Sequence, residues 1–259
     1  MAEKSNLALS ILLFTIGLTA CGQPRVTLPS GTSTAAPDFE TAYDEARAAC
    51  DSVRSLQAEL GLSGRAAGQR LRGRVLAGLI PDALRLEGVA PFGAPVFILV
   101  ADGPRGTLLL SRERRVVQDA APEDILNALV GVPLGANDLR AVLTGCVKAA
   151  PAATTARAYG AEWLAVDLAA GGTIYLHRAA NVWRIVAGRY GGLEIDYAAF
   201  EGNRPSRVVV RGTDVNLTLA LSQVEINGDL PRDQLVALKI PDGVAPLSLE
   251  QLRKAGPLE

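Results

Sequence analysis

Residues 70–79 read Arg-Leu-Arg-Gly-Arg-Val-Leu-Ala-Gly-Leu, and apolar or small residues occupy every second position of this stretch. Leu71, Val75 and Leu79 fall on one face of an extended chain, while arginines fill the positions between them at its start. Such alternation is typical of a β-strand with one face on a core and the other in water. The chain is therefore expected to be built around a sheet.

The same two-residue period recurs on both sides of this strand. Leu84 and Leu86 alternate with Arg85 and Glu87, and residues 96–100 are apolar on both faces. Because short turns separate successive segments, we expect antiparallel pairing. The further strands are predicted at 107–110, 115–118, 163–168, 173–177, 182–190, 193–200, 206–211 and 215–223.

Helical spacing appears in four places. Apolar residues three and four apart, from Phe39 to Leu60, predict one amphipathic helix over 38–60. Proline and acids open a second helix at Pro122, and Gly131 ends it. A third is predicted over 137–146 and a short last one over 247–254. The order predicts a mainly β fold with α: a single curved antiparallel sheet whose concave side is covered by helices.

The N-terminal segment has the pattern of an export signal. Residues 7–18 form an uncharged run behind Lys4, too short to span a bilayer as a helix. Leu18-Thr19-Ala20-Cys21-Gly22 follows directly and resembles the lipobox of bacterial lipoproteins, in which the cysteine is lipidated and becomes the new N-terminus. The resemblance implies removal of residues 1–20 and a covalent lipid on Cys21. Two or three acyl chains would hold the protein permanently at a membrane.

Composition divides the rest into a tether and a domain. Residues 21–37 are rich in Pro, Ser, Thr and Gly and are read as a flexible tether, and residues 38–259 as one domain. With 26 basic and 27 acidic residues, the chain offers no electrostatic reason to bind nucleic acid. We expect a monomer.

Two cysteines remain besides Cys21. Cys50 and Cys146 lie on apolar faces of predicted helices, where either a disulfide or two separate buried thiols would fit. A metal site is not expected, because the sole histidine is His177 and no close cysteine pair exists.

Motifs of catalysis are missing from the sequence. It has no Gly-x-Ser-x-Gly, no phosphate-binding loop, no dinucleotide-binding glycine pattern and no Cys-x-x-Cys. His177 stands in an alternating segment beside Arg178 and is interpreted as a surface or cross-strand residue. We expect neither enzymatic activity nor a cofactor beyond the lipid.

Three stretches resemble the outer-membrane lipoprotein receptor LolB and its relatives, including the periplasmic carrier LolA. Residues 84–93, Leu-Arg-Leu-Glu-Gly-Val-Ala-Pro-Phe-Gly, are similar to a strand that enters a protruding loop. Residues 123–134, with Asp138-Leu139-Arg140 and Leu143-Thr144-Gly145, are similar to the family's helix, Gly-x-Pro turn and second helix. Trp183-Arg184-Ile185-Val186 with Tyr190-Gly191-Gly192 resembles its late strand pair.

This resemblance implies an unclosed antiparallel β half-barrel, capped by helices, with an apolar cavity that accepts the acyl chains of other lipoproteins. The loop Pro91-Phe92-Gly93 would insert Phe92 into the bilayer; alternatively, Phe92 folds back into the core. The partners implied are the membrane, lipoprotein acyl chains or another lipid, and a periplasmic LolA-like carrier. The cavity-lining candidates, each of which plain core packing would also explain, are Val75, Leu86, Ile98, Leu108, Leu126, Leu143, Val166 and Ile185.

Three functions are carried forward. The first is a LolB-like acceptor on the periplasmic face of the outer membrane, which helps to insert lipoproteins there. Gly22 favours that membrane, since Asp at this position retains enterobacterial lipoproteins in the inner one. The second is a lipid or hydrophobic-ligand binder of the same fold in another envelope pathway. The third is a structural lipoprotein with a packed core.

Overall fold

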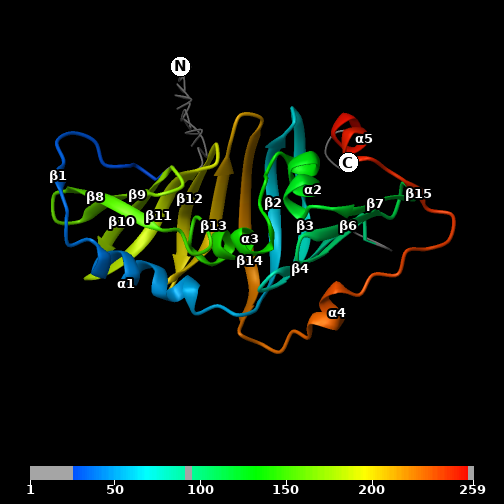
Figure 1. Ribbon diagram of the computed structural model, residues 1–259, viewed down its shortest axis with the longest axis horizontal. Coiled ribbons are helices and arrows are strands. Elements are labelled where there is room, and N and C mark those ends of the chain that lie inside the picture. The colour runs from blue at the N-terminus through cyan, green and yellow to red at the C-terminus, as the bar shows by residue number, and fades with distance from the viewer. Residues whose placement is uncertain (1–25, 91–94, 256–259) are drawn as a thin grey trace, which may run out of the picture.

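A single curved sheet of fifteen strands forms the body of the protein (Figure 1). The computed structural model describes residues 26–90 and 95–255. The sheet does not close, and its strand order is β1-β8-β9-β10-β11-β12-β13-β14-β2-β3-β4-β5-β6-β7-β15. Every neighbouring pair is antiparallel except β15 with β7. The expected half-barrel is confirmed.

Two meanders meet in the middle of this sheet. β14 pairs with β2 along ten residue pairs from Val215↔Ala66 to Ile226↔Leu56, which joins the late strands to the early ones. The first meander contains β2 Leu56–Ala66, β3 Gln69–Ile80, β4 Ala83–Val89, β5 Phe97–Asp102, β6 Arg105–Leu110 and β7 Arg115–Ala120. The second contains β8 Ala153–Tyr159, β9 Trp163–Leu168, β10 Thr173–Ala179, β11 Val182–Tyr190, β12 Leu193–Glu201, β13 Arg204–Arg211 and β14 Val215–Ile226.

Three helices cover the concave face, as the element order predicted (Figure 1). α1 Glu40–Asp51 packs on β11, and α2 Pro122–Val130 and α3 Ala136–Thr144 lie over the first meander and the centre of the sheet. Pro122 stands at the start of α2, and Gly131 ends it in the left-handed conformation with φ 71°. Gly145 ends α3 in the same way. These helices share one apolar core with the inward faces of the strands.

The C-terminal segment runs along the other face and then around the edge of the sheet. α4 Arg232–Val236 contacts β4 and β5, and Leu235 is buried there. β15 Ala245–Pro246 pairs in parallel with β7, and α5 Leu249–Ala255 packs against α2. Val100 is buried on the α4 side of β5, which explains why residues 96–100 are apolar on both faces.

The predicted helix over 38–60 is wrong in its second half. α1 ends at Asp51, and Leu56 begins β2, in which Leu56, Ala58 and Leu60 are buried at every second position. A leucine four residues from the next fits a helical and an alternating pattern alike, so spacing alone could not separate them. The tether also ends earlier than residue 37, because β1 Thr34–Ala35 pairs with β8.

Within the described residues, none of the helices combines the length and apolar character needed to cross a bilayer.

Candidate functional site

An apolar cavity lies between the first meander and the helices above it. We call it the hollow; its volume is about 100 Å³. Its floor comes from the inward faces of β2 to β5, β13 and β14, and its roof from α2, α3 and the turn between them. The floor includes Leu60, Leu86 and Leu217, and the roof includes Leu126, Leu129 and Leu139. Every residue in the lining is aliphatic except Phe97, so the space suits hydrocarbon.

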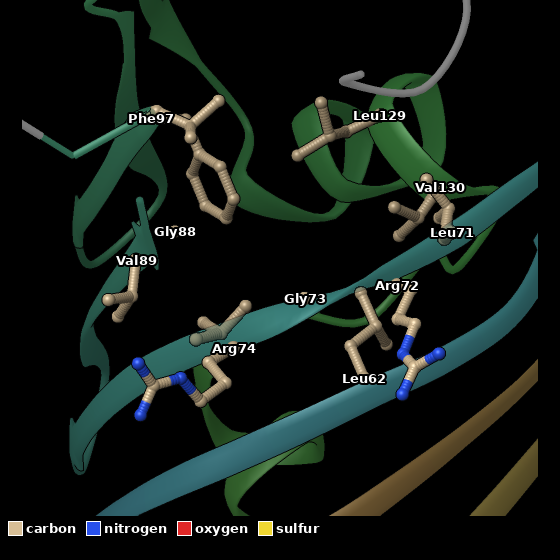
Figure 2. Close-up of a pocket in the computed structure, with 12 residues that line it drawn as sticks. Leu62, Leu71, Arg72, Gly73, Arg74, Gly88, Val89, Phe97, Leu129 and Val130 are labelled. Carbon is tan, nitrogen blue, oxygen red and sulfur yellow. The ribbon is translucent and has the colours of Figure 1, made fainter. Parts of the chain in front are cut away.

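A second pocket, the mouth, continues the hollow toward solvent and measures about 140 Å³. The two spaces share Leu62, Val75, Phe97, Leu129 and Val130 and are therefore contiguous. In Figure 2 the side chains of Phe97 and Leu129 face this space from opposite sides. Four of the five shared residues are only half-buried, which shows that solvent reaches the junction.

Two glycines shape the mouth. Gly73 occupies an inward position of β3, opposite Leu62, and a Cβ there would meet no atom within 4 Å. Gly88 of β4 lies opposite Val75, and a Cβ there would come within 2.5 Å of two carbons of the Phe97 ring. Gly73 thus leaves space empty, whereas Gly88 makes room for the ring of Phe97.

The mouth reaches the surface where strand pairing stops. β3 and β4 are paired from Ile80↔Ala83 to Arg74↔Val89, and residues 69–73 of β3 extend beyond the last pair. Val89 and Val96, on either side of the β4–β5 connection, both line the mouth. Arg72 and Arg74, from the outward face of β3, line it too. The opening is therefore apolar inside and cationic at its rim.

The structure places three of the eight candidate lining residues at the hollow: Val75, Leu86 and Leu126. Leu108, Val166 and Ile185 are buried in the core instead. Leu143 lines a separate space of about 20 Å³. Ile98 follows Phe97 on β5 and so lies on the opposite face of that strand.

Sequence reasoning missed most of the remaining lining. Leu60 escaped because its segment was assigned to a helix, and Leu62 because it follows the end of that predicted helix, although Leu56, Leu60 and Leu62 also fit an alternating pattern. Leu217 and Leu219 belong to the cleanly alternating segment 215–223, which gave a usable signal. Leu129 and Leu139 both lie in the second of the three stretches that carry the family resemblance.

Two predicted sites lie outside the described residues: the lipidation site Cys21 and the loop Pro91-Phe92-Gly93.

A disulfide joins Cys50 to Cys146, with their Cα atoms 6.0 Å apart, which decides between the two readings of these cysteines. It connects the last turn of α1 to the residue after Gly145, the C-cap of α3. The side chain of Arg140 on α3 also donates a hydrogen bond to the carbonyl of Val53. Both links fix α3, part of the roof of the hollow, to the segment that leads into β2.

The described lining offers little acid–base chemistry. No side chain that lines the hollow titrates, and the arginines of the rim are the charged groups at the mouth. His177 lies in β10, directly opposite Trp163, with ring centroids 4.4 Å apart, which fits the cross-strand interpretation. The arrangement can shelter an alkyl chain from water and present charge at the opening.

Comparisons with known proteins give the fold. No family model and no curated protein matches the chain. Among solved structures it resembles a LolA superfamily protein from Nitrosomonas europaea, with 12% identity and a TM-score of 0.51 over 76% of this chain and 97% of that one. It also resembles a putative outer membrane lipoprotein-sorting protein domain from Vibrio parahaemolyticus, with 10% identity and a TM-score of 0.50 over the same shares of the two chains. The chain therefore has a LolA-like fold: a large unclosed β-sheet accompanied by a few helices.

Proposed function

We propose that this protein is a lipid-anchored lipoprotein of the bacterial envelope that takes an acyl chain into the hollow. The contiguous apolar hollow and mouth carry the proposal, because they offer hydrocarbon both a dry space and a route to it. Each methylene moved from water into such a space gains about 0.8 kcal/mol, the same gain as entering a bilayer. Transfer between protein and membrane then needs no chemical fuel, and neither catalysis nor a cofactor is part of the proposal.

The described conformation fits a state without ligand. The hollow and the mouth measure about 100 and 140 Å³, below the roughly 300–1,000 Å³ of typical ligand pockets. Phe97 and Leu129 face the junction between the two spaces, and rotation of these side chains would merge them (Figure 2). The Cα framework need not move for this first step, since side-chain rotation is the commonest change on binding.

A LolB-like acceptor on the periplasmic face of the outer membrane is the specific form of this proposal. The fold likeness and the lipobox pattern at Cys21 support it. Its partners would be the membrane, the acyl chains of lipoproteins and a LolA-like carrier. A lipid binder of another envelope pathway is the second candidate, favoured by the small volume of the hollow.

Filling the mouth, the route into the hollow, tests the proposal. Gly73→Val would place a side chain in the empty position without requiring a left-handed backbone. Gly61→Val is the matched control: Gly61 faces outward one residue before Leu62, the partner of Gly73, and a Cβ there meets Ala220 at an ordinary 3.6 Å. We expect the soluble protein and the control to bind a fluorescent fatty acid. Gly73→Val should bind it at least tenfold more weakly, which corresponds to a loss of about 1.4 kcal/mol of binding free energy.

Cargo transfer separates the candidates. Purified LolA carrying a labelled lipoprotein is mixed with each variant, and movement of the label is followed. Transfer to the soluble protein but not to Gly73→Val supports the acceptor. Fatty-acid binding without transfer supports the second candidate. Absence of any bound fatty acid would leave the structural lipoprotein with a packed core and overturn the proposal.

A further inference from the structure

Four arginines gather on the hairpin of β2 and β3, where the mouth opens. Arg65, Arg70, Arg72 and Arg74 are all exposed and all lie on the outward face of their strands. Arg65 and Arg70 stand directly opposite each other in the register. Like charges in that position destabilise a sheet, so the cluster works against the stability of the hairpin.

Counter-charges for this cluster are scarce within residues 26–90 and 95–255. Of the four arginines, Arg74 alone reaches a carboxylate there, that of Glu59 at 3.5 Å, and its side chain remains 58% exposed. A contact of that length and exposure neutralises little charge. The cluster therefore presents positive charge that the described part of the protein does not use.

Arg72 and Arg74, the rim pair, connect this charge to the apolar site. They flank Gly73, the residue whose open position leads into the mouth, and both line the mouth. In Figure 2 their guanidinium groups point away from the ring of Phe97. A chain that entered beside Gly73 would leave its polar end at these two groups.

A polar recess adjoins the mouth at the same place. It measures about 660 Å³, shares Leu71 and Arg72 with the mouth, and adds Ser63, Arg65, Arg70 and Asn216. Guanidinium groups bind phosphate and carboxylate through paired, charge-assisted hydrogen bonds. A space of this kind beside an apolar mouth suits a head group that is anionic and hydrated.

We infer that the ligand of the hollow is an amphiphile with an anionic head, a phosphate or a carboxylate, held by the rim pair while its alkyl chain enters beside Gly73. The inference rests on the proposed function and names the class of ligand. A neutral acylglycerol would gain the apolar contacts but not the contacts with the rim pair.

Lipids with matched chains test this. Palmitoyl lysophosphatidate, palmitate and monopalmitoylglycerol, each below its critical micelle concentration, displace the neutral probe 1-N-phenylnaphthylamine from the soluble protein. We expect both anionic lipids to bind about tenfold more tightly than the glycerol ester, since hydrogen bonds between charged groups are stronger than those between neutral ones. This preference should shrink as salt is added. Inorganic phosphate alone should displace no probe.

Removal of charge at the rim gives the decisive variant. Arg72→Gln with Arg74→Gln should lower the affinities for palmitate and palmitoyl lysophosphatidate to the affinity for the glycerol ester. Arg105→Gln with Arg207→Gln is the control, because it removes the same charge from two exposed arginines that line neither the mouth nor the recess. We expect the control to keep the full preference for the anionic lipids.

The outcomes separate this inference from the proposed function. Equal binding of all three lipids by the unmodified protein overturns the inference alone and leaves the acyl-chain site standing. If neither the glycerol ester nor the anionic lipids bind, both the inference and the proposed function are wrong. If the rim variant keeps its lipid preference but no longer sediments with phosphatidylglycerol vesicles, the arginines contact a membrane surface and the inference is wrong.

Discussion

The two ends of the concave face are closed in different ways. Over the second meander, α1 lies directly on β11, and inward residues of β10 and β11, such as Ile174, Leu176 and Ile185, are at most 2% exposed. Over the first meander, α2 and α3 leave the hollow, and Leu62, Val75 and Phe97 stay half-buried. One sheet thus carries a filled end and a hollow end, and the difference lies in the covering helices and in glycines at positions where side chains would fill the space.

The disulfide should give one of the two largest effects, because it links the helix of the filled end to α3 at the hollow end. Replacing Cys50 and Cys146 by alanine should lower the free energy of unfolding by about 2–5 kcal/mol, since the bridge closes a long loop in the unfolded chain. Urea unfolding followed by circular dichroism measures this. A loss below about 1 kcal/mol would contradict the view that the bridge holds the two ends together.

Leucine truncation should distinguish the two ends directly. Leu176→Ala, at a fully buried position of the filled end, should cost about 4–5 kcal/mol, near the top of the range for such changes. Leu86→Ala borders a space that is already empty and should cost about 2–3 kcal/mol, because fewer contacts are lost. Chemical denaturation of both variants gives the comparison. Equal losses would mean that the hollow end is packed as tightly as the filled end.

Within the hollow end, the two glycines should respond in opposite ways. Gly88→Ala pushes a methyl group against the Phe97 ring and should cost about 1–3 kcal/mol. Gly73→Ala adds a methyl group to empty space and should be neutral or stabilising by up to about 1 kcal/mol. Thermal melts of the two variants check this, and a large loss at Gly73 would show that the mouth is not empty.

A tyrosine in the second meander should give the smallest effect at neutral pH. Burial raises the pKa of the Tyr197 phenol well above 10.0, and its hydroxyl has no hydrogen-bond partner among the described residues. Tyr197→Phe should therefore change the free energy of unfolding by less than about 1 kcal/mol.

The effect of Tyr197 should grow in alkali. The folded state holds the proton more tightly than the unfolded state, so this contribution to stability is complete below pH 10.0 and is lost as the pH rises toward the folded-state pKa. The unmodified protein should lose stability over that range more steeply than Tyr197→Phe. Parallel pH dependences of the two proteins would contradict burial of a protonated phenol.

Local signals explain which elements the sequence predicted. α2 has Pro122 at its start and Gly131 at its end, and the strand around Val75 has apolar or small residues at every second position, so both were predicted. The residues of β8, Ala153–Tyr159, carry too few large apolar side chains to show a period. α4 and β15 are held by distant contacts, such as those of Leu235 with the outer face of the sheet, which local patterns do not show.

The candidate site was harder to predict than the fold. Inward residues of one strand look alike in sequence whether a helix or an empty space covers them, so Val75 and Val166 received the same interpretation although the first lines the hollow and the second lies in the core. In the sequence alone, Gly73 indicates only a weak point in a strand. The structure shows that a side chain at this position would enter empty space.

The outermost strands bear on how the protein coexists with its own copies. An open sheet exposes two rows of unpaired amides, and a long, flat row would recruit a second molecule and seed a fibre. Here each row ends in a strand of two residues, Thr34–Ala35 at one side and Ala245–Pro246 at the other, and Pro246 has no amide hydrogen to donate. The segments that contribute least to the hollow thus let the sheet stay open without recruiting further molecules at its edges.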